Sequence, residues 1–283
     1  LIPRPRGAGG AMMNGMTPLL APNASPMTLD GTWTFIVGAE RPVVIDPGPA
    51  DPAHRDAILA ALGGVRPLAI LLTHSHGDHS QLAPELARIT GAPLMMARGA
   101  VNRQVDPAAV GRWLEEDDVF GTDAGTLHVV ATPGHAPEHV SFYWPQASSV
   151  FVGDTFMGQG DTTLVAPPEG DLAAYLLTLE KIAELSPATL YPAHGLPIAD
   201  AEAAIQRYRH HRETRIAQVV HALRRTGPSH TAGLIDTVYG NELHPALRMP
   251  AQGSLEAILG YLTSVGQAHA LPDGRYTLTE MDG

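Results

Sequence analysis

The sequence predicts an α/β protein with a smaller, mostly helical domain at its C-terminus, and three observations lead to this prediction. Short apolar runs alternate with helical patterns over the first two thirds of the chain. Clusters of polar residues follow the ends of the predicted strands. The charge balance also changes near residue 199, because residues 1–198 hold 10 basic and 20 acidic side chains whereas residues 199–283 hold 8 and 9. We therefore expect two domains, 1–198 and 199–283.

The elements of the first domain follow from its apolar pattern. Short apolar runs between glycine, proline or aspartate are typical of strands, and longer stretches with apolar residues three or four positions apart are typical of helices. Residues 1–26 show neither pattern, so we expect irregular chain there. In chain order, the expected elements are strands at 32–37 and 42–45, a helix at 53–62, a strand at 68–72, a helix at 82–90, strands at 126–131, 140–143 and 149–152, an amphipathic helix at 171–185 and a strand at 189–191.

The second domain begins with a long helix. Apolar residues recur at helical spacing over 199–225, and Gly227 and Pro228 end the pattern. Two more helices are expected at 232–239 and 255–265, followed by two short strands on either side of the turn sequence Pro272-Asp273-Gly274. Two helices followed by a hairpin are the order of a winged helix, so the sequence predicts a winged-helix-like domain.

Composition excludes several classes of protein. The formal net charge of -11 argues against nonspecific nucleic-acid binding. The absence of cysteine excludes disulfides, thiol nucleophiles and zinc sites with thiolate ligands, and leaves 14 histidines for metal binding. No apolar run approaches the roughly 18 residues that span a bilayer, and no apolar signal core follows the first residues. We therefore expect a cytoplasmic protein without membrane contact.

One loop carries the main chemical signal. The segment Thr73-His74-Ser75-His76-Gly77-Asp78-His79 places four potential metal ligands directly after a predicted buried strand. Residues two apart in extended chain point the same way, so His74 and His76 can bind one ion. Gly77 lets the chain turn and present Asp78 and His79 to a second ion. The alternative is a cluster of solvated histidines at the start of the following helix.

One loop is too short to complete two metal sites, because a catalytic zinc ion takes about three protein ligands and a water. Three later segments each follow a predicted strand and contain glycine, and each offers one further ligand. Taken singly, a histidine beside a turn is more often a surface residue. Together with the loop, they predict a shared metal centre. The candidate ligands are His135 in Thr132-Pro133-Gly134-His135, Asp154 in Gly153-Asp154-Thr155, and His194 in Tyr191-Pro192-Ala193-His194-Gly195.

These motifs in this order resemble the metallo-β-lactamase superfamily of hydrolases over about residues 28–198. The resemblance implies an αββα sandwich, two divalent metal ions with zinc expected and manganese or iron as alternatives, and a metal-bridging hydroxide as the nucleophile. It implies a catalytic role for Asp78, which would orient the hydroxide. The implied ligands are His74, His76 and His135 for the first ion, Asp78, His79 and His194 for the second, and Asp154 for both.

A narrower resemblance extends over nearly the whole chain. The segments 21–32 and 132–139, and a Tyr-x-x-His-Arg-x-x-Arg pattern in the long helix, resemble a lactamase-like subfamily that includes a mitochondrial endoribonuclease and fungal polyketide thioesterases. Trp33 stands where that subfamily has asparagine, so a changed substrate pocket is one reading. The absence of cysteine agrees with the all-His/Asp sites of glyoxalase II-like and RNA-processing members, and departs from several antibiotic-hydrolysing classes.

Five residues outside the ligand set are candidates for substrate binding. For the histidine four residues past His135, a buried structural role is equally consistent with the sequence. The run 207–225 holds six arginines against one glutamate and could bind phosphates or an anionic acyl carrier, although a solvated helix face is the simpler reading. One of these arginines, Arg212, falls on the apolar stripe, so we expect it to have a carboxylate partner or to face the active-site cleft. The five candidates are His139, Tyr208, His211, Arg212 and Arg215.

The sequence thus predicts a dinuclear metal-dependent hydrolase, and three functions remain open. Hydrolysis of an ester or acyl thioester is favoured by the acidic first domain. Cleavage of single-stranded RNA is supported by the subfamily resemblance and the arginine run. A non-enzymatic regulator would use the winged-helix-like domain to bind DNA or protein, but the complete ligand set argues against this.

Overall fold

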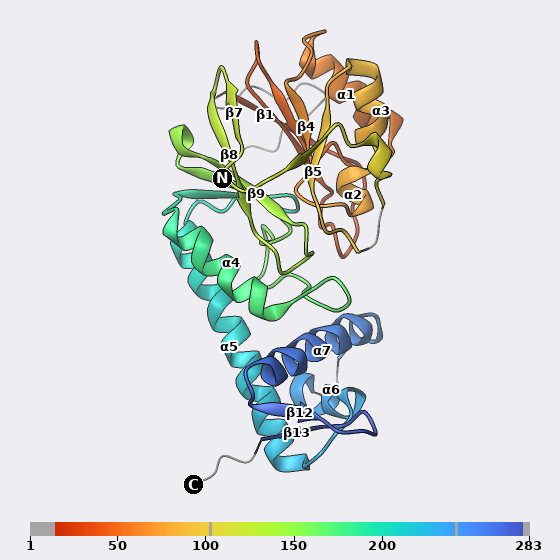
Figure 1. Ribbon diagram of the computed structural model, residues 1–283, viewed down its shortest axis with the longest axis vertical. Helices are drawn as coiled ribbons and strands as arrows, with labels where there is room; N and C mark the ends of the chain where they lie inside the picture. The colour runs from red at the N-terminus through yellow and green to blue at the C-terminus, as the bar shows by residue number, and fades with distance from the viewer. Residues whose placement is uncertain (1–14, 102–103, 241–242, 280–283) are drawn as a thin grey trace.

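Two β-sheets form the centre of the larger, N-terminal part of the molecule in the computed structural model, which describes residues 15–101, 104–240 and 243–279 (Figure 1). One sheet has six strands and the other has five. The six are β1 (Met16–Leu20), β2 (Trp33–Val37), β3 (Val43–Ile45), β4 (Ala69–Leu71), β5 (Leu94–Ala97) and β6 (Arg112–Leu114). The five are β7 (Val119–Thr122), β8 (Gly125–Ala131), β9 (Val140–Trp144), β10 (Ser149–Gly153) and β11 (Thr189–Pro192).

Both sheets are mixed, and the connections explain why. In the order β1-β2-β3-β4-β5-β6, the first three strands are antiparallel and the rest are parallel. In the order β11-β10-β9-β8-β7, only β10 and β11 are parallel. Parallel neighbours need a crossover, which helices supply between β3 and β4, β4 and β5, and β10 and β11. The helices of this part are α1 (Pro52–Leu62), α2 (Gly77–Ser80), α3 (Ala83–Thr90), α4 (Leu172–Glu184) and the 3-10 turns η1 (Pro107–Ala109) and η2 (Pro145–Ala147).

The side chains of each strand alternate between the two faces of its sheet, and both faces are covered. The two sheets therefore lie between two layers of helices. Val43 and Ile45 of β3 meet Phe151 of β10 in an apolar cluster between the sheets. Val44 points the opposite way, into a cluster with α1 and α3, and Val152 points into a cluster with α4. Successive side chains of a strand face opposite sides of its sheet, so both sheets are buried on both faces. The predicted αββα sandwich is confirmed (Figure 1).

The C-terminal part consists of helices and a two-stranded sheet. Its first helix runs along α4 and continues into the remaining elements (Figure 1). One apolar cluster joins Tyr175 of α4 to Leu255 and Leu259 of the last helix, so this part shares a core with the sandwich. Every helix that the structure describes is too short or too polar to cross a membrane. The elements are α5 (Ala201–Thr226), α6 (Thr231–Tyr239), η3 (Pro245–Leu247), α7 (Arg248–Ser264), β12 (Ala268–Ala270) and β13 (Tyr276–Leu278).

The structure corrects several sequence-based expectations. Within 1–26, where irregular chain is expected, residues 16–20 form β1 and pair with β2, while residues 1–14 lie outside the described part. The strands β5, β6 and β7 are also missing from the expectation. All four are short, and pairing with a neighbouring strand stabilises them more than their own composition does. The last helix begins at residue 248 instead of 255, because Pro250 lies in its first turn, where a missing N–H is tolerated.

One contact between turns of the two sheets gives a pH-dependent prediction. The Asp123 carboxylate, in the β7–β8 turn, accepts hydrogen bonds from the backbone N–H groups of Ala39, Glu40 and Arg41 in the β2–β3 turn at 2.8–3.1 Å. These bonds lower the pKa of Asp123 from 3.8 to about 2.

We expect Asp123→Asn to be less stable than the wild type at pH 7. The folded pKa lies below the unfolded pKa, so the contribution of Asp123 is fully present above about pH 4 and is lost as the pH falls toward 2. Urea unfolding of both proteins between pH 7 and pH 3 measures this. A stability difference that grew in acid would contradict the assignment.

Candidate metal centre

Four loops at strand ends bring the seven predicted ligands together. The loop after β4 and the short helix α2 provide four of them, the loop after β8 provides one, and the ends of β10 and β11 provide one each. They form two groups, and within each group one nitrogen or oxygen atom per residue lies within 4.8 Å of the others. The groups are His74, His76, His135 and Asp154, and Asp78, His79 and His194.

In the first group, three imidazole nitrogens face one another. Nδ1 of His76 lies 2.9 Å from Nε2 of His74 and 3.1 Å from Nε2 of His135. A carboxylate oxygen, Oδ2 of Asp154, lies 3.6 Å from the same nitrogen of His135. Three imidazole nitrogens and one carboxylate oxygen are a donor set that fits a divalent metal ion.

In the second group, the carboxylate of Asp78 faces two histidines. Its Oδ2 lies 3.3 Å from Nε2 of His194 and 3.6 Å from Nε2 of His79. The other oxygen of Asp154, Oδ1, lies 3.3 Å and 3.4 Å from the same two nitrogens. Asp154 therefore turns one oxygen toward each group.

The nitrogen that each histidine turns away from the centre is held by another group. Such a contact fixes the orientation of the ring and leaves the opposite nitrogen able to bind a metal. Where the partner is a backbone carbonyl, the outer nitrogen must donate, so the inner nitrogen carries the lone pair. The pairs are His74 Nδ1 with Thr73 Oγ1 at 3.0 Å, His76 Nε2 with Glu169 Oε2 at 2.8 Å, His79 Nδ1 with Asp46 Oδ2 at 2.9 Å, His135 Nδ1 with the Leu164 carbonyl at 2.8 Å, and His194 Nδ1 with the Gly31 carbonyl at 3.1 Å.

Burial keeps two histidines of the first group neutral. Desolvation lowers the pKa of His135 and, more strongly, that of His74. A neutral imidazole carries one proton, so a ring whose outer nitrogen donates has its inner nitrogen available to bind a metal.

The second group shows the opposite shift. Burial alone would lower the pKa of His79, but the carboxylates of Asp154, Asp78 and Asp46 raise it well above its usual value. Burial would also lower the pKa of His194, but Asp154 and Asp78 outweigh this effect and raise the pKa to about 9. Burial would raise the pKa of Asp154, yet the two histidines hold it well below its usual range. The carboxylates thus favour positive charge at this point, which a divalent cation would supply.

Unsatisfied atoms support the same conclusion. Nε2 of His79 and Oδ1 of Asp154 are buried and make no hydrogen bond within the described part of the chain. A buried polar atom without a partner is costly in free energy, by about 1–3 kcal/mol. Coordination of a cation would remove this cost, so the residues fit a metal ion.

Local backbone features allow the loops to approach. Asp46 accepts hydrogen bonds from the N–H and hydroxyl of Thr73 at 2.8 and 2.7 Å, which ties the end of β3 to the start of the histidine loop. Gly153 has a φ of 47°, and a Cβ there would lie 2.5 Å from Nε2 of His139. Gly134 has a φ of 136°, and its Cβ would lie 2.5 Å from the Cα of Tyr175. Glycine at these two positions therefore lets the strand ends converge.

His139, a candidate for substrate binding, lies against the cluster but is buried. Its Nδ1 lies 2.8 Å from Oγ1 of Thr132, and its Nε2 accepts the N–H of Asp154 at 3.2 Å. Burial lowers its pKa to about 3. Both ring nitrogens thus have partners, and Nε2 holds the backbone N–H of Asp154.

Tyr208 and Arg215, two of the candidates on α5, contact residues outside the ligand set. The hydroxyl of Tyr208 accepts the N–H of Met157 at 2.9 Å and donates to its carbonyl at 3.1 Å. Arg215 lies over the ring of Tyr239 at 4.6 Å. His211 is half-buried, and burial together with the neighbouring arginines lowers its pKa to about 4.

Of the two alternatives expected for Arg212, the carboxylate partner is wrong, and an orientation toward the active-site cleft stays a prediction. Its side chain is 4% exposed and has no carboxylate partner among the described residues. One guanidinium nitrogen instead donates to the Thr163 carbonyl at 2.5 Å, and the group lies 4.9 Å from the ring centre of Tyr175. A carbonyl and an aromatic face replace the expected negative charge.

Trp33 supports the loop that carries His194. Its indole N–H donates to the Gly195 carbonyl at 2.7 Å, and its backbone N–H donates to the Ala193 carbonyl at 2.8 Å. Sequence reasoning does not find these contacts, nor those of Glu169, Leu164 and Gly31 with the ligand histidines. Backbone carbonyls have no signature in the sequence, so only the fold reveals them.

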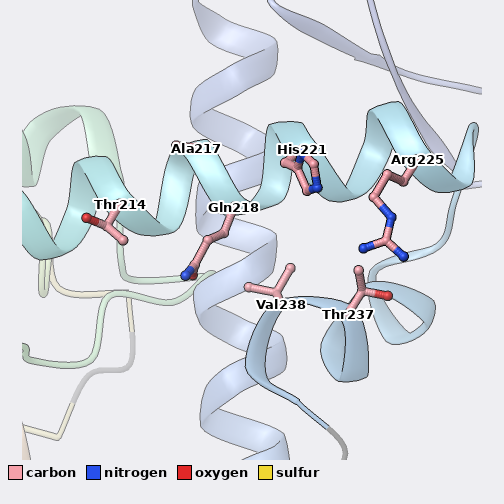
Figure 2. A pocket seen from close by; sticks show the side chains of 7 residues that line it. All are labelled: Thr214, Ala217, Gln218, His221, Arg225, Thr237 and Val238. Atoms are coloured by element: carbon pink, nitrogen blue, oxygen red, sulfur yellow. The ribbon is translucent and has the colours of Figure 1, made fainter.

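A pocket of about 400 Å³ lies elsewhere, between α5 and α6 (Figure 2). Figure 2 shows the exposed side of α5 above the end of α6, and the pocket contains none of the predicted metal ligands. It does not therefore mark the chemical site. Its lining residues are Thr214, Ala217, Gln218, His221, Arg225, Thr237 and Val238.

Comparison with known proteins gives matches over most of the chain. Residues 27–194 match the model of the metallo-beta-lactamase superfamily. The chain is 33% identical over 248 residues to the lactamase-like protein adaB of Aspergillus niger, covering 81% of this chain and 75% of that protein. It is 30% identical over 259 residues to the atrochrysone carboxyl ACP thioesterase AgnL7 of Paecilomyces divaricatus, covering 88% and 79%.

A solved structure shows the same fold. The beta-lactamase domain protein from Burkholderia ambifaria superposes with a TM-score of 0.80 at 24% sequence identity. The match covers 95% of this chain and 93% of that one, so it extends into the C-terminal helices.

Proposed function

Because the chain belongs to the metallo-beta-lactamase superfamily of hydrolases, we propose that it hydrolyses acyl thioesters with two divalent metal ions. The observation that carries this proposal is the convergence of seven histidine and aspartate side chains in two adjoining groups. A relative that is named a thioesterase supports the choice of substrate. Zinc is the proposed metal, and manganese or iron would suit the same ligands.

We assign the ligands as the resemblance implies. Asp154 would contribute to both sites, because its two oxygens face different groups. Its negative charge would offset the repulsion between two cations. The first ion is assigned to His74, His76 and His135, and the second to Asp78, His79 and His194.

The reaction adds water to the thioester carbonyl carbon and breaks the C–S bond, which yields a carboxylic acid and a thiol. When bound, the metal ions supply a water of lowered pKa and polarise the carbonyl oxygen. Asp78 orients the attacking water through its carboxylate, which is 30% exposed and is the most accessible of the carboxylates in the two groups. His76 is held by Glu169 and His135 by the Leu164 carbonyl, so the positions of both rings are fixed before substrate arrives.

Cleavage of RNA receives less support from the arginines of α5. Arg207 and Arg209 form ion pairs with Asp161 and Glu180. Arg212 is buried, and Arg215 lies over an aromatic ring. Of the six, only Arg224 and Arg225 are exposed and form no ion pair or hydrogen bond with another described residue. An RNA groove would need more free positive charge.

We also propose that residues 199–283 form a winged-helix-like domain. The order α5, α6, α7 and the β12–β13 hairpin supports this assignment. Its helices α5 and α7 contact α4, and Tyr208 and Arg212 of α5 contact the loop before α4. These contacts support a role beside the active site.

Turnover of defined substrates tests the proposed function. Purified protein loaded with zinc, manganese or iron is mixed with a panel of acyl thioesters, and thiol release is measured with a chromogenic reagent. We expect metal-dependent thiol release that a chelator abolishes. If no metal form releases thiol but single-stranded RNA is cut at low salt, the endoribonuclease alternative replaces the thioesterase. If neither substrate reacts, a hydrolytic role for this site is wrong in both forms.

A further inference from the structure

A single loop contacts both histidines that complete the first ligand group. This loop, residues 155–171, joins β10 to α4 and contains neither a helix nor a strand. It begins directly after Asp154. Its Leu164 carbonyl accepts from Nδ1 of His135, and its Glu169 carboxylate lies 2.8 Å from Nε2 of His76. The positions of these rings therefore depend on a segment without regular backbone hydrogen bonds.

Side chains from α4 and α5 hold this loop. The hydroxyl of Tyr175 donates to the Thr155 carbonyl at 2.8 Å. The hydroxyl of Tyr208 binds both backbone groups of Met157. Arg212 donates to the Thr163 carbonyl, one residue before the carbonyl that binds His135. Of these three contacts, that of Arg212 lies nearest along the chain to Leu164, the residue whose carbonyl contacts His135.

The burial of Arg212 is costly for a merely structural residue. A guanidinium group that is 4% exposed has lost most of its water, and no carboxylate in the described part of the chain pairs with it. Its Nε also lacks a hydrogen bond there. An apolar side chain of similar length would fill the space without this cost. What an apolar residue cannot do is bind the Thr163 carbonyl.

We propose that Arg212 is a positioning residue for the first metal site, acting through Thr163 and Leu164 on His135. By fixing the Thr163 carbonyl, Arg212 also fixes the adjacent Leu164 carbonyl. The Leu164 carbonyl keeps the proton on Nδ1 of His135, so that Nε2 of this ring faces His76 and Asp154. The C-terminal helix thereby contributes to a site formed by residues of the sandwich. The inference rests on the metal-binding half of the proposed function.

Zinc affinity of the separate sites tests this inference. Arg212→Met is made in two backgrounds. His194→Ala leaves the first ligand group intact, and His76→Ala leaves the second ligand group intact. Zinc affinity is measured by competition with a chromophoric chelator. We expect Arg212→Met to weaken zinc binding about 10- to 100-fold in the first background and by less than about 2-fold in the second.

Arg209→Met is the matched control. Arg209 lies on the same helix, but it pairs with Glu180 of α4 at 3.2 Å and does not contact the loop. We expect this change to leave zinc affinity unaltered in both backgrounds. Equal losses in both backgrounds with Arg212→Met, or no loss in either, would overturn the inference. If the parent proteins bind no zinc, the proposed function fails instead.

A second measurement needs no metal. Imidazole nitrogen NMR of the metal-free protein reports which nitrogen of His135 carries the proton. Arg212→Lys keeps the buried charge and replaces Arg212→Met in this measurement if the methionine variant does not fold. We expect the Nδ1–H form in the wild type and a mixture of forms in the lysine variant, whose shorter amine cannot reach Thr163 in the same geometry. An unchanged His135 in Arg212→Lys would contradict the proposal.

Discussion

Asp154→Asn is expected to lower kcat/KM for acyl thioesters by about 10³-fold, which corresponds to about 4 kcal/mol of transition-state stabilisation. Asp154 turns one oxygen toward His135 and the other toward His79 and His194. Asparagine has nearly the same shape but carries no charge, so two cations in this position would repel each other without an intervening carboxylate. Thiol-release kinetics and the metal content of the purified variant measure the effect, and we expect fewer than two ions per chain.

The control for this prediction is Asp236→Asn. Asp236 is half-exposed and pairs with Arg248 within the C-terminal helices, so losing its charge leaves the site intact. We expect unchanged kinetics and full metal content for that variant. If Asp154→Asn keeps kcat/KM within about 10-fold of the wild type, which is about 1.4 kcal/mol, Asp154 does not hold the two ions.

Asp46→Ala is expected to reduce the free energy of unfolding of the metal-free protein by about 3–5 kcal/mol, as the loss of one partner from a buried charged network does. The Asp46 carboxylate accepts from the N–H and hydroxyl of Thr73 and contacts Nδ1 of His79. All these groups are buried, so alanine would leave them without an acceptor. Urea unfolding followed by circular dichroism measures the loss.

Two further variants separate the causes. Asp46→Asn keeps one acceptor oxygen and tolerates the φ of 46° at this position, so we expect a smaller loss than with alanine. Asp51→Ala removes the N-cap of α1, where the side chain accepts only the N–H of His54, and should cost about 1 kcal/mol. A loss for Asp46→Ala no larger than that of Asp51→Ala would show that the network contributes little.

The sequence predicts the candidate site better than it predicts the surroundings of that site. The histidine loop is recognisable because four ligand types fall within six residues. The distant partners His135, Asp154 and His194 are recognisable because each follows a predicted strand, and strand ends on adjacent sheets meet. Local sequence patterns therefore predict both the histidine loop and its distant partners.

Contacts that depend on the path of the chain leave no such signal. The Leu164 and Gly31 carbonyls orient His135 and His194, but any residue type could provide them. Glu169 lies 93 positions from His76 and is one of many acidic residues. The carboxylate partner, one of the two alternatives expected for Arg212, is wrong for the same reason, because a carbonyl in an irregular loop takes its place. The strand β1 is missed because its stability comes from pairing with β2.

The central claim is that seven side chains of this chain hold two divalent cations. Elemental analysis of protein that is purified without a histidine tag, then dialysed after incubation with zinc, manganese or iron, tests it most directly. We predict two ions of one of these metals per chain, falling to one when His194 is replaced by alanine. Protein that retains no more than a trace of any of the three would contradict the claim.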